Sequence, residues 1–403
     1  MRSTILTFIT TAGSLALLAA PLPLAAQEQN QQSGHPRYTV IDLGSLQGGT
    51  FSQPFSINSH GLVGGAASLP NNEQHGVLWS RELIVDLGTL GGANSVVFGS
   101  NARDQAVGEA ERSTEDPNGE DFCGFGTHRK CSPFLWERGV MKPLPTLGGD
   151  NGAANQINNQ GLVSGFAENS QPDRRCPAPQ VYEFKPVLWI NGKVLELPTI
   201  AGDPDGVALS ANRSGQIVGA SGTCTTFNSN TLFNLLPVHA VLWSEGRTVD
   251  LGNLGGNTGQ AGGNLAWAIN DAGQVVGVSD LPGDTTFHAF LWTRTTGMKD
   301  IGTLPGDAAS SASAINKRGD VVGISLDQNF NPRAFLWQAG VMSDLNKLIP
   351  ANSTLILLTA CSINARGEIT GLAMTGSGEA HAYLAVPTQY EHEDGVSSAS
   401  GAE

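Results

Sequence analysis

The chain has 403 residues, of which 51 are glycines and only 14% are charged, and its net charge is −14. A composition rich in glycine and poor in charge is typical of a turn-rich β protein and argues against a helical or disordered chain. The excess of acidic residues disfavours binding to nucleic acid phosphates, so we expect no nucleic acid partner.

Residues 1–26 predict an export signal. One early charge, Arg2, precedes an apolar run over residues 5–20, and the small residues that end at Ala26 suit a signal peptidase. The run is short for a membrane span, and an uncleaved anchor is the alternative interpretation. The polar residues 27–37 read as a linker, and no later segment is long and apolar enough to cross a bilayer. We therefore expect a secreted or periplasmic protein with no membrane span.

A pattern of four short apolar runs recurs seven times between Tyr38 and Pro387. The first run of each unit ends in an Asn, and a glycine follows each Asn by seven residues. These asparagines are Asn58, Asn101, Asn158, Asn212, Asn270, Asn316 and Asn364. Six units have a second glycine three residues after the Asn. This spacing predicts a hairpin turn in which the Asn side chain caps its own backbone and the glycine takes a positive φ.

The third run of a unit ends in Leu-Trp, and the fourth ends in Asp-Leu or a relative of it. The tryptophans of the third run are Trp79, Trp136, Trp189, Trp243, Trp292 and Trp337. Six copies of the fourth run lie between units, and a seventh stands alone at the front as residues 38–44. The last unit has no fourth run of its own. One strand at the front and three at the end therefore complete one unit.

This count predicts an all-β fold, a seven-bladed β-propeller over residues 38–387. Each blade has four antiparallel strands, and the N-terminal strand closes the last blade. Closure removes the free sheet edges that an open array would leave. An open β-solenoid is the alternative, but its last unit would not need a strand from the front of the chain to complete it. The polar tail, residues 388–403, reads as disordered.

Several recurring motifs resemble a known family. The tripeptide of residues 288–290 reads HAF, residues 86–92 read DLGTLGG, and residues 314–316 read AIN. In this combination the chain resembles the HAF-type extracellular repeat family across essentially the whole mature sequence. The resemblance implies a predicted secreted bacterial protein without an assigned activity. It supports the fold and export, and it implies no catalytic residues.

The histidine of the HAF motif raises the question of a metal site. It appears as His75, His239, His288 and His381. This residue opens the third strand, about two strand spacings of ~4.8 Å from the innermost strand. Copies in neighbouring blades would then lie too far apart to share an ion whose ligands lie ~2.0–2.1 Å away. We expect a structural hydrogen bond to the Asp of a neighbouring strand, blade-to-blade packing for the tryptophans, and neither a metal nor a cofactor.

Departures from the repeat indicate the functional surface. The link between the second and third runs is long only in units two, three and four, within residues 110–132, 167–185 and 220–239. If the fourth strand is outermost, these links lie on the same face as the crossovers between blades. Three adjacent blades then build a raised wall, here called the loop wall, and projecting loops are where binding residues usually sit. The predicted binding residues are Glu115, Asp116, Asp121, Arg129, Arg174, Arg175 and Tyr182.

Four of the five cysteines lie in these insertions. Cys123, Cys131, Cys176 and Cys224 allow three pairings, and we favour Cys123 with Cys131 and Cys176 with Cys224. Cys361 reads as a buried free thiol. A zinc site is disfavoured because no pair has C-x₂₋₄-C spacing.

Two classes of function remain open. The first is a binding or scaffold module that recognises an extracellular carbohydrate or protein through the loop wall, and we expect this module to be a monomer. The second is a propeller hydrolase or lyase that acts on a polysaccharide. Paired acids for such chemistry would come from Glu115, Asp116, Glu120 and Asp121 beside His128. In such a loop they are more typical of a solvated charge cluster, and no catalytic signature appears, so we predict no catalytic residue.

Overall fold

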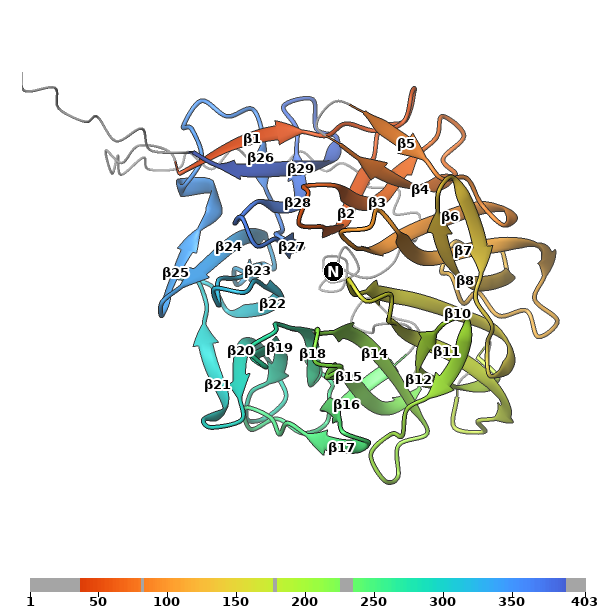
Figure 1. Cartoon of the computed structure of the whole chain (residues 1–403). Helices are drawn as coiled ribbons and strands as arrows, with labels where there is room; N and C mark the ends of the chain where they lie inside the picture. Colours follow the sequence, from red (N-terminus) through yellow and green to blue (C-terminus); the bar gives the residue numbers. More distant parts are fainter. Residues whose placement is uncertain (1–36, 81–82, 177–179, 225–234, 389–403) are drawn as a thin grey trace, which may run out of the picture.

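The computed structural model describes residues 37–80, 83–176, 180–224 and 235–388, and it forms a closed ring of seven antiparallel sheets (Figure 1). This arrangement confirms the predicted all-β, seven-bladed propeller. The predicted export signal, most of the linker and the tail from residue 389 lie outside the described residues. Within the described ranges, no helix has the length and apolar character needed to span a membrane.

The first six blades each take four consecutive strands, ordered from the channel outward. The innermost strands are β2 (Ser52–Ile57), β6 (Gly91–Ser100), β10 (Gly148–Ile157), β14 (Asp205–Ala211), β18 (Leu265–Ile269) and β22 (Ala309–Ile315). The second strands are β3 (Val63–Ser68), β7 (Ala106–Glu115), β11 (Val163–Pro172), β15 (Ile217–Cys224), β19 (Val275–Asp280) and β23 (Val321–Leu326). The third strands are β4 (Gln74–Trp79), β8 (Arg129–Glu137), β12 (Tyr182–Ile190), β16 (Leu235–Ser244), β20 (Phe287–Thr293) and β24 (Pro332–Gln338). The outermost strands are β5 (Ile84–Asp86), β9 (Val140–Pro143), β13 (Lys193–Glu196), β17 (Arg247–Asp250), β21 (Gly297–Gly302) and β25 (Val341–Asp344).

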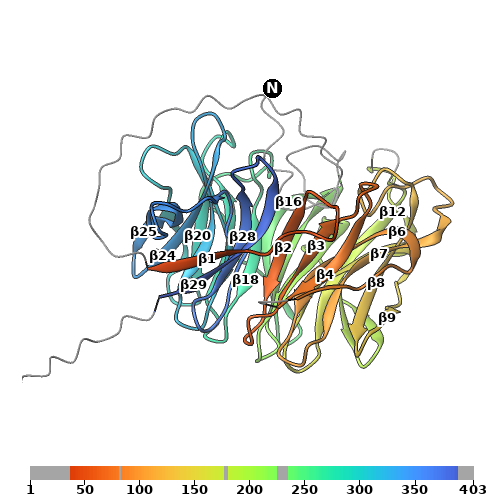
Figure 2. The same ribbon diagram turned by 90° about the horizontal axis from the view of Figure 1, so that it is seen from above.

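Blade seven joins the two ends of the chain. Its outermost strand is β1 (Tyr38–Asp42), which pairs antiparallel with β29 (Ala380–Pro387), and β29 pairs with β28 (Ile369–Met374). The inner edge is interrupted, because β26 (Ile356–Leu357) and β27 (Ser362–Ile363) pair separately with β28. The N-terminal strand therefore closes the last blade, as predicted. Figure 2 shows the ring edge-on, with the strands running between its two faces.

The tryptophan that ends each third strand packs against the preceding blade. Trp189 of blade three lies in one core cluster with Val107 of blade two, and Trp243 of blade four clusters with Leu188 of blade three. Trp79 is 1% exposed and contacts the cluster that contains Leu384 of blade seven. These contacts bury the flat faces of neighbouring sheets, which is the main hydrophobic contribution to the ring. The predicted blade-to-blade role is confirmed.

The repeated histidines pair with aspartates. Nδ1 of His75, His288 and His381 lies 2.8 to 3.0 Å from the carboxylate of the outermost strand of the same blade. Their partners are Asp86, Asp300 and Asp42, respectively. His239 instead contacts Asp203, in the crossover that enters its blade, at 2.9 Å. The predicted structural hydrogen bond is therefore confirmed, with one change of partner.

The repeated asparagines form a closed circle of hydrogen bonds. The Nδ2 group of each Asn donates to the backbone carbonyl of the corresponding Asn in the next blade, and Asn364 donates back to Asn58. The seven donor–acceptor distances lie between 2.9 and 3.4 Å. Each Oδ1 also caps its own hairpin turn, as at Asn212, where it accepts from the amides of Ser214 and Gln216. We call this end of the ring the Asn-ring face. The loop wall stands on the opposite face.

Replacing Asn212 with alanine is expected to lower the free energy of unfolding by about 2–4 kcal/mol, because a buried side chain that makes several hydrogen bonds would leave its partners unsatisfied. Asn212 is 4% exposed and bonds both to its own turn and to Asn270 of the next blade. Asn253→Ala is the matched control. Asn253 is exposed and accepts a similar turn bond from Gly255, so its loss should cost about 1 kcal/mol or less. Urea denaturation of both variants measures the difference, and equal losses would contradict a stabilising role for the circle.

Candidate functional site

The insertions of blades two and three rise on the face that carries the crossovers between blades. They link β7 to β8 and β11 to β12, and the blade-four insertion follows β15. Residues 177–179 and 225–234 of these insertions lie outside the described residues. The fourth strand of each unit is outermost, so the face predicted for the loop wall is correct.

The blade-two insertion is braced from within. Asp116 is 6% exposed, and its Oδ1 accepts hydrogen bonds from the amides of Asn118 and Glu120. The carboxylate of Asp121 accepts from the amide of Gly126 at 2.9 Å. The Cys123–Cys131 disulfide ties the insertion to β8, with the two Cα atoms 5.5 Å apart. Two of the acids predicted to face a ligand therefore hold the loop together.

Asn151 at the start of blade three anchors this loop to the neighbouring blade. Its Nδ2 group donates to Oδ2 of Asp116 and to Oε2 of Glu120, both at 2.9 Å, and its Oδ1 accepts from the amide of Cys131. The side chain is 0% exposed. Because each polar atom of Asn151 is used between two blades, the insertion is fixed in position relative to the ring.

A buried carboxyl pair, Glu120 and Glu168, lies at the same blade boundary. Oε1 of Glu120 accepts from the amide of Val181 at 2.6 Å, and Oε1 of Glu168 accepts from Nε2 of Gln180 at 2.9 Å. Burial, and then the hydrogen bond and repulsion from Glu120, raise the pKa of Glu168 to about 9. Burial also raises the pKa of Glu120, so the pair holds a proton at neutral pH. The two residues are 1% and 0% exposed, so the pair is enclosed rather than open to a substrate.

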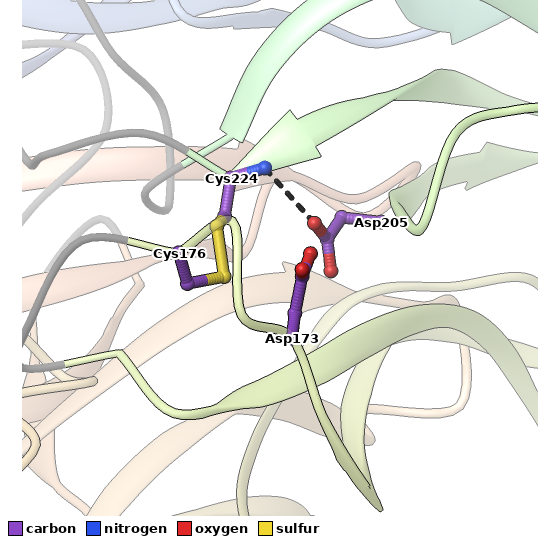
Figure 3. A group of neighbouring side chains, drawn as sticks. All are labelled: Asp173, Cys176, Asp205 and Cys224. Atoms are coloured by element: carbon purple, nitrogen blue, oxygen red, sulfur yellow. Dashed lines mark hydrogen bonds between the residues drawn. A yellow bond between two sulfur atoms is a disulfide. The ribbon is translucent and has the colours of Figure 1, made fainter.

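A second cluster lies at the boundary of blades three and four (Figure 3). Asp173 and Cys176 come from the blade-three insertion, Asp205 begins β14, and Cys224 ends β15. Cys176 and Cys224 form the second disulfide, so both predicted pairings are confirmed. Cys361 is a free thiol, as predicted, and burial raises its pKa to about 11.

The two aspartates of this cluster are both buried. Asp205 is 0% exposed and accepts hydrogen bonds from the amides of Phe184 and Cys224. Burial, together with the charge of Asp173, raises its pKa to about 7, while the amides of Phe184 and Cys224 act in the opposite direction. Asp173 is 7% exposed, and its Oδ1 accepts from the backbone and the side chain of Arg175.

The remaining predicted residues lie on the outside of the loop wall. Glu115 and Arg129 are cross-strand neighbours at the base of the blade-two insertion, and Arg129 donates to the carbonyl of Ser113 at 2.6 Å. Arg174 and Arg175 are exposed on the blade-three insertion, and Tyr182 is partly exposed where β12 begins. Thus Arg174 and Arg175 are exposed and Tyr182 is partly exposed, while among the predicted acids Asp116 is buried, Asp121 is partly buried and Glu115 is exposed.

The inner strands carry a feature that sequence analysis missed. In each of blades one to six a β-bulge interrupts the innermost strand three residues before the repeated Asn. The bulged residues are Phe55, Phe98, Asn155, Leu209, Trp267 and Ser313. Bulges re-aim side chains and often lie near functional sites. The sequence did contain one sign of this feature. The residue type three positions before the repeated Asn differs from unit to unit, whereas the turn that follows is constant.

Two of these bulged residues contact each other. The rings of Phe55 and Phe98, from neighbouring blades, lie 5.2 Å apart in an edge-to-face arrangement. At the Asn-ring face there is a polar depression, which includes Gln156, Arg213 and Asp271 in its lining. This polar depression therefore lies on the side opposite the loop wall.

No protein-family model matches the sequence, and a search of curated proteins finds no relative. Among solved structures, the chain is similar to the β-propeller domain of the Trilobed protease from Pyrococcus furiosus, at 12% identity over 78% of this chain and 90% of that chain, with a TM-score of 0.45. It is also similar to the WD40 propeller domain of Doa1, at 12% identity over 87% and 94% of the two chains and a TM-score of 0.40. A puromycin-hydrolyzing peptidase of Mycobacterium tuberculosis is 11% identical over 88% of this chain and 52% of that one, with a TM-score of 0.39. Such likenesses concern the fold alone, and we transfer no activity from them.

Proposed function

We propose that this protein is an exported, non-catalytic binding propeller that recognises an extracellular carbohydrate through the loop wall of blades two to four. The observation that carries the proposal is that three of the four candidate acids of the blade-two insertion are engaged within the protein, and Glu115 alone is exposed. Asp116 and Glu120 are buried and hydrogen-bonded to Asn151, and Asp121 caps a turn of its own loop. Acids engaged in this way brace a recognition surface and are not positioned to act as a catalytic pair on a bound substrate.

The outer surface of the wall supports recognition. Arg174, Arg175 and Tyr182 offer guanidinium donors and an aromatic ring, which suit sugar hydroxyl and carboxylate groups. Within the described part of the wall, two disulfides and the buried carboxyl pair tie the insertions to the ring, which lowers the ordering entropy lost on binding. Disulfides also suit a secreted or periplasmic location, and the recurring motifs support our proposal that the chain is related to the HAF-type repeat proteins.

Affinity electrophoresis tests the proposal. The mature protein is run through native gels that contain neutral or uronate-bearing polysaccharides, and the polysaccharide is stained afterwards. We expect retardation on at least one gel with the stain intact. Arg174→Ala should weaken binding about fivefold or more if this arginine is a principal contact. Arg213→Ala is the matched control, because Arg213 is an exposed arginine on the Asn-ring face that pairs with Asp271.

Three other outcomes would each contradict one part of the proposal: the absence of catalysis, the location of the site, or the carbohydrate ligand. A cleared zone would establish a polysaccharide-degrading enzyme. Loss of retardation in Arg213→Ala alone would move the binding site to the opposite face. Migration unchanged on every gel would overturn carbohydrate recognition and favour a protein ligand.

A further inference from the structure

The cluster at the boundary of blades three and four has the composition of a metal site. Asp173, Cys176, Asp205 and Cys224 each offer one ligand atom, and these four atoms lie within 4.8 Å of one another. Ligand atoms around tetrahedral zinc lie about 3.3–3.8 Å apart, given Zn–S bonds of ~2.3 Å and Zn–O bonds of ~2.0–2.2 Å. To bind such an ion, the two sulfur atoms would separate to about 3.8 Å once the disulfide is broken, and the more widely spaced ligand atoms would move slightly closer together. The disulfide currently occupies both sulfur atoms.

The carboxylate of Asp173 gives an independent indication of a missing partner. Its side chain is 4% exposed, and Oδ2 is buried without a hydrogen-bond partner, although Oδ1 is engaged by Arg175. Figure 3 shows the carboxyl group of Asp173 directed toward Asp205 and the disulfide. A buried, unpaired carboxylate oxygen is costly, and a cation beside it would remove that cost.

The charges around the cluster suit a divalent ion. Two carboxylates and two thiolates carry four negative charges, and Arg175 and Lys185 are the cations that face the aspartates. Lys185 also pairs with Glu183 at 2.8 Å, so its charge is shared. A bound divalent ion would offset the negative charge that remains after these contacts.

We propose that reduction of the Cys176–Cys224 disulfide converts this cluster into a tetrahedral site for a divalent transition metal such as Zn²⁺, with Asp173, Asp205, Cys176 and Cys224 as its ligands. A dithiol reductant supplies two electrons and two protons, so that the S–S bond breaks, two Cys thiols form and the dithiol becomes a cyclic disulfide. Metal binding then forms two metal–sulfur bonds and releases the two thiol protons. The metal holds the blade-three insertion to blade four in place of the disulfide.

Cobalt provides a direct readout. The full mature chain is reduced with a dithiol, the reductant is removed under anaerobic conditions, and Co²⁺ is titrated in. We expect thiolate-to-cobalt charge-transfer absorption, together with the visible bands of tetrahedral Co²⁺, that saturate and are displaced by Zn²⁺. The oxidised protein should show neither.

Variants assign the ligands. Asp173→Asn keeps an oxygen for Arg175 but removes the free carboxylate oxygen, and it should weaken Co²⁺ affinity at least about tenfold. Cys176→Ser with Cys224→Ser should abolish the charge-transfer band. The matched controls are Glu183→Gln, which alters a nearby acid outside the cluster, and Cys123→Ser with Cys131→Ser, which removes the other disulfide near Glu109.

Three results would overturn the proposal. The first is an octahedral cobalt spectrum in the reduced protein, and the second is a charge-transfer band that survives the loss of Cys176 and Cys224. The third is no binding at all in a reduced protein that retains its β-sheet circular dichroism. Asp173→Asn preserves the disulfide-forming cysteines, so it still tests the site if the double cysteine variant fails to fold. None of these readouts depends on carbohydrate binding.

Discussion

A mature chain that begins at Ser45, and so lacks β1, is expected to lose its cooperative unfolding transition. β1 pairs with β29 over five residue pairs, and Tyr38 is 4% exposed within the core shared by blades six and seven. The amide of Tyr38 also donates to the carbonyl of Leu348 at 3.0 Å. Loss of a large buried aromatic side chain alone costs about 3–5 kcal/mol. Together with the ladder, this approaches the whole stability of a domain, about 5–15 kcal/mol.

A circular permutant provides the control for this deletion. The Cα atom of Tyr38 lies opposite that of Pro387 in the antiparallel ladder, so a short turn can join these residues. The permutant then begins at Ser45 and ends at Gly44, and it retains every strand. We expect it to fold into the ring, whereas the deletion shows no sharp transition in thermal circular dichroism. If the deletion melted as sharply and at the same temperature as the intact chain, β1 would have no role in closure.

The ring could be predicted from sequence because its signals are local. The turn at Asn212 is set by residues within four positions, and the packing role of Trp189 follows from its fixed slot in the repeat. The lone strand at residues 38–42 can then only complete the last blade, which closes the ring. Even the histidine contacts are largely local, since His288 and Asp300 lie on adjacent strands of one blade.

The site could not be predicted in the same way because its contacts are not local. Glu120 bonds to Val181, which lies 61 positions away, and Asn151 reaches Asp116 across 35 positions. The composition of the blade-two insertion showed acids in a loop, but it did not reveal a buried asparagine from the next blade that turns them inward. The interruption between β26 and β27 likewise has no counterpart in the other units, and repeat spacing alone gave no sign of it.

Stability is expected to fall as the pH rises from 7 to 9, and Glu168→Gln should make that fall measurably smaller. In the folded protein the pKa of Glu168 is raised to about 9, whereas an unfolded glutamate titrates at about 4.3. Between these values the folded state holds a proton that the unfolded chain has released. Unfolding therefore releases a proton, and the free energy of unfolding decreases with rising pH by up to about 1.4 kcal/mol per pH unit.

Two other buried acids also have raised pKa values, Asp205 and Glu109. Glu109 is present in both the wild type and Glu168→Gln, so the difference between their two slopes reports Glu168. Asp205 has a pKa of about 7, so it contributes its own slope mainly below that pH. Over two pH units the slope due to Glu168 amounts to roughly 2–3 kcal/mol. Glutamine stays neutral, and its amide can donate to Glu120 in place of the carboxylic acid. If the new contact with Gln180 is less favourable, it lowers the free energy of unfolding equally at every pH and leaves the slope unchanged.

Urea unfolding at several pH values from 7 to 9 measures this slope for the wild-type protein and for Glu168→Gln. Glu183→Gln is the matched control, because Glu183 is a partly exposed glutamate of the same blade that pairs with Lys185. We expect parallel curves for the control and the wild type, and a flatter curve for Glu168→Gln. A wild-type slope that Glu168→Gln leaves unchanged would mean that Glu168 is ionised in the fold. The proton shared with Glu120 would then not be what holds the blade-two insertion against blade three.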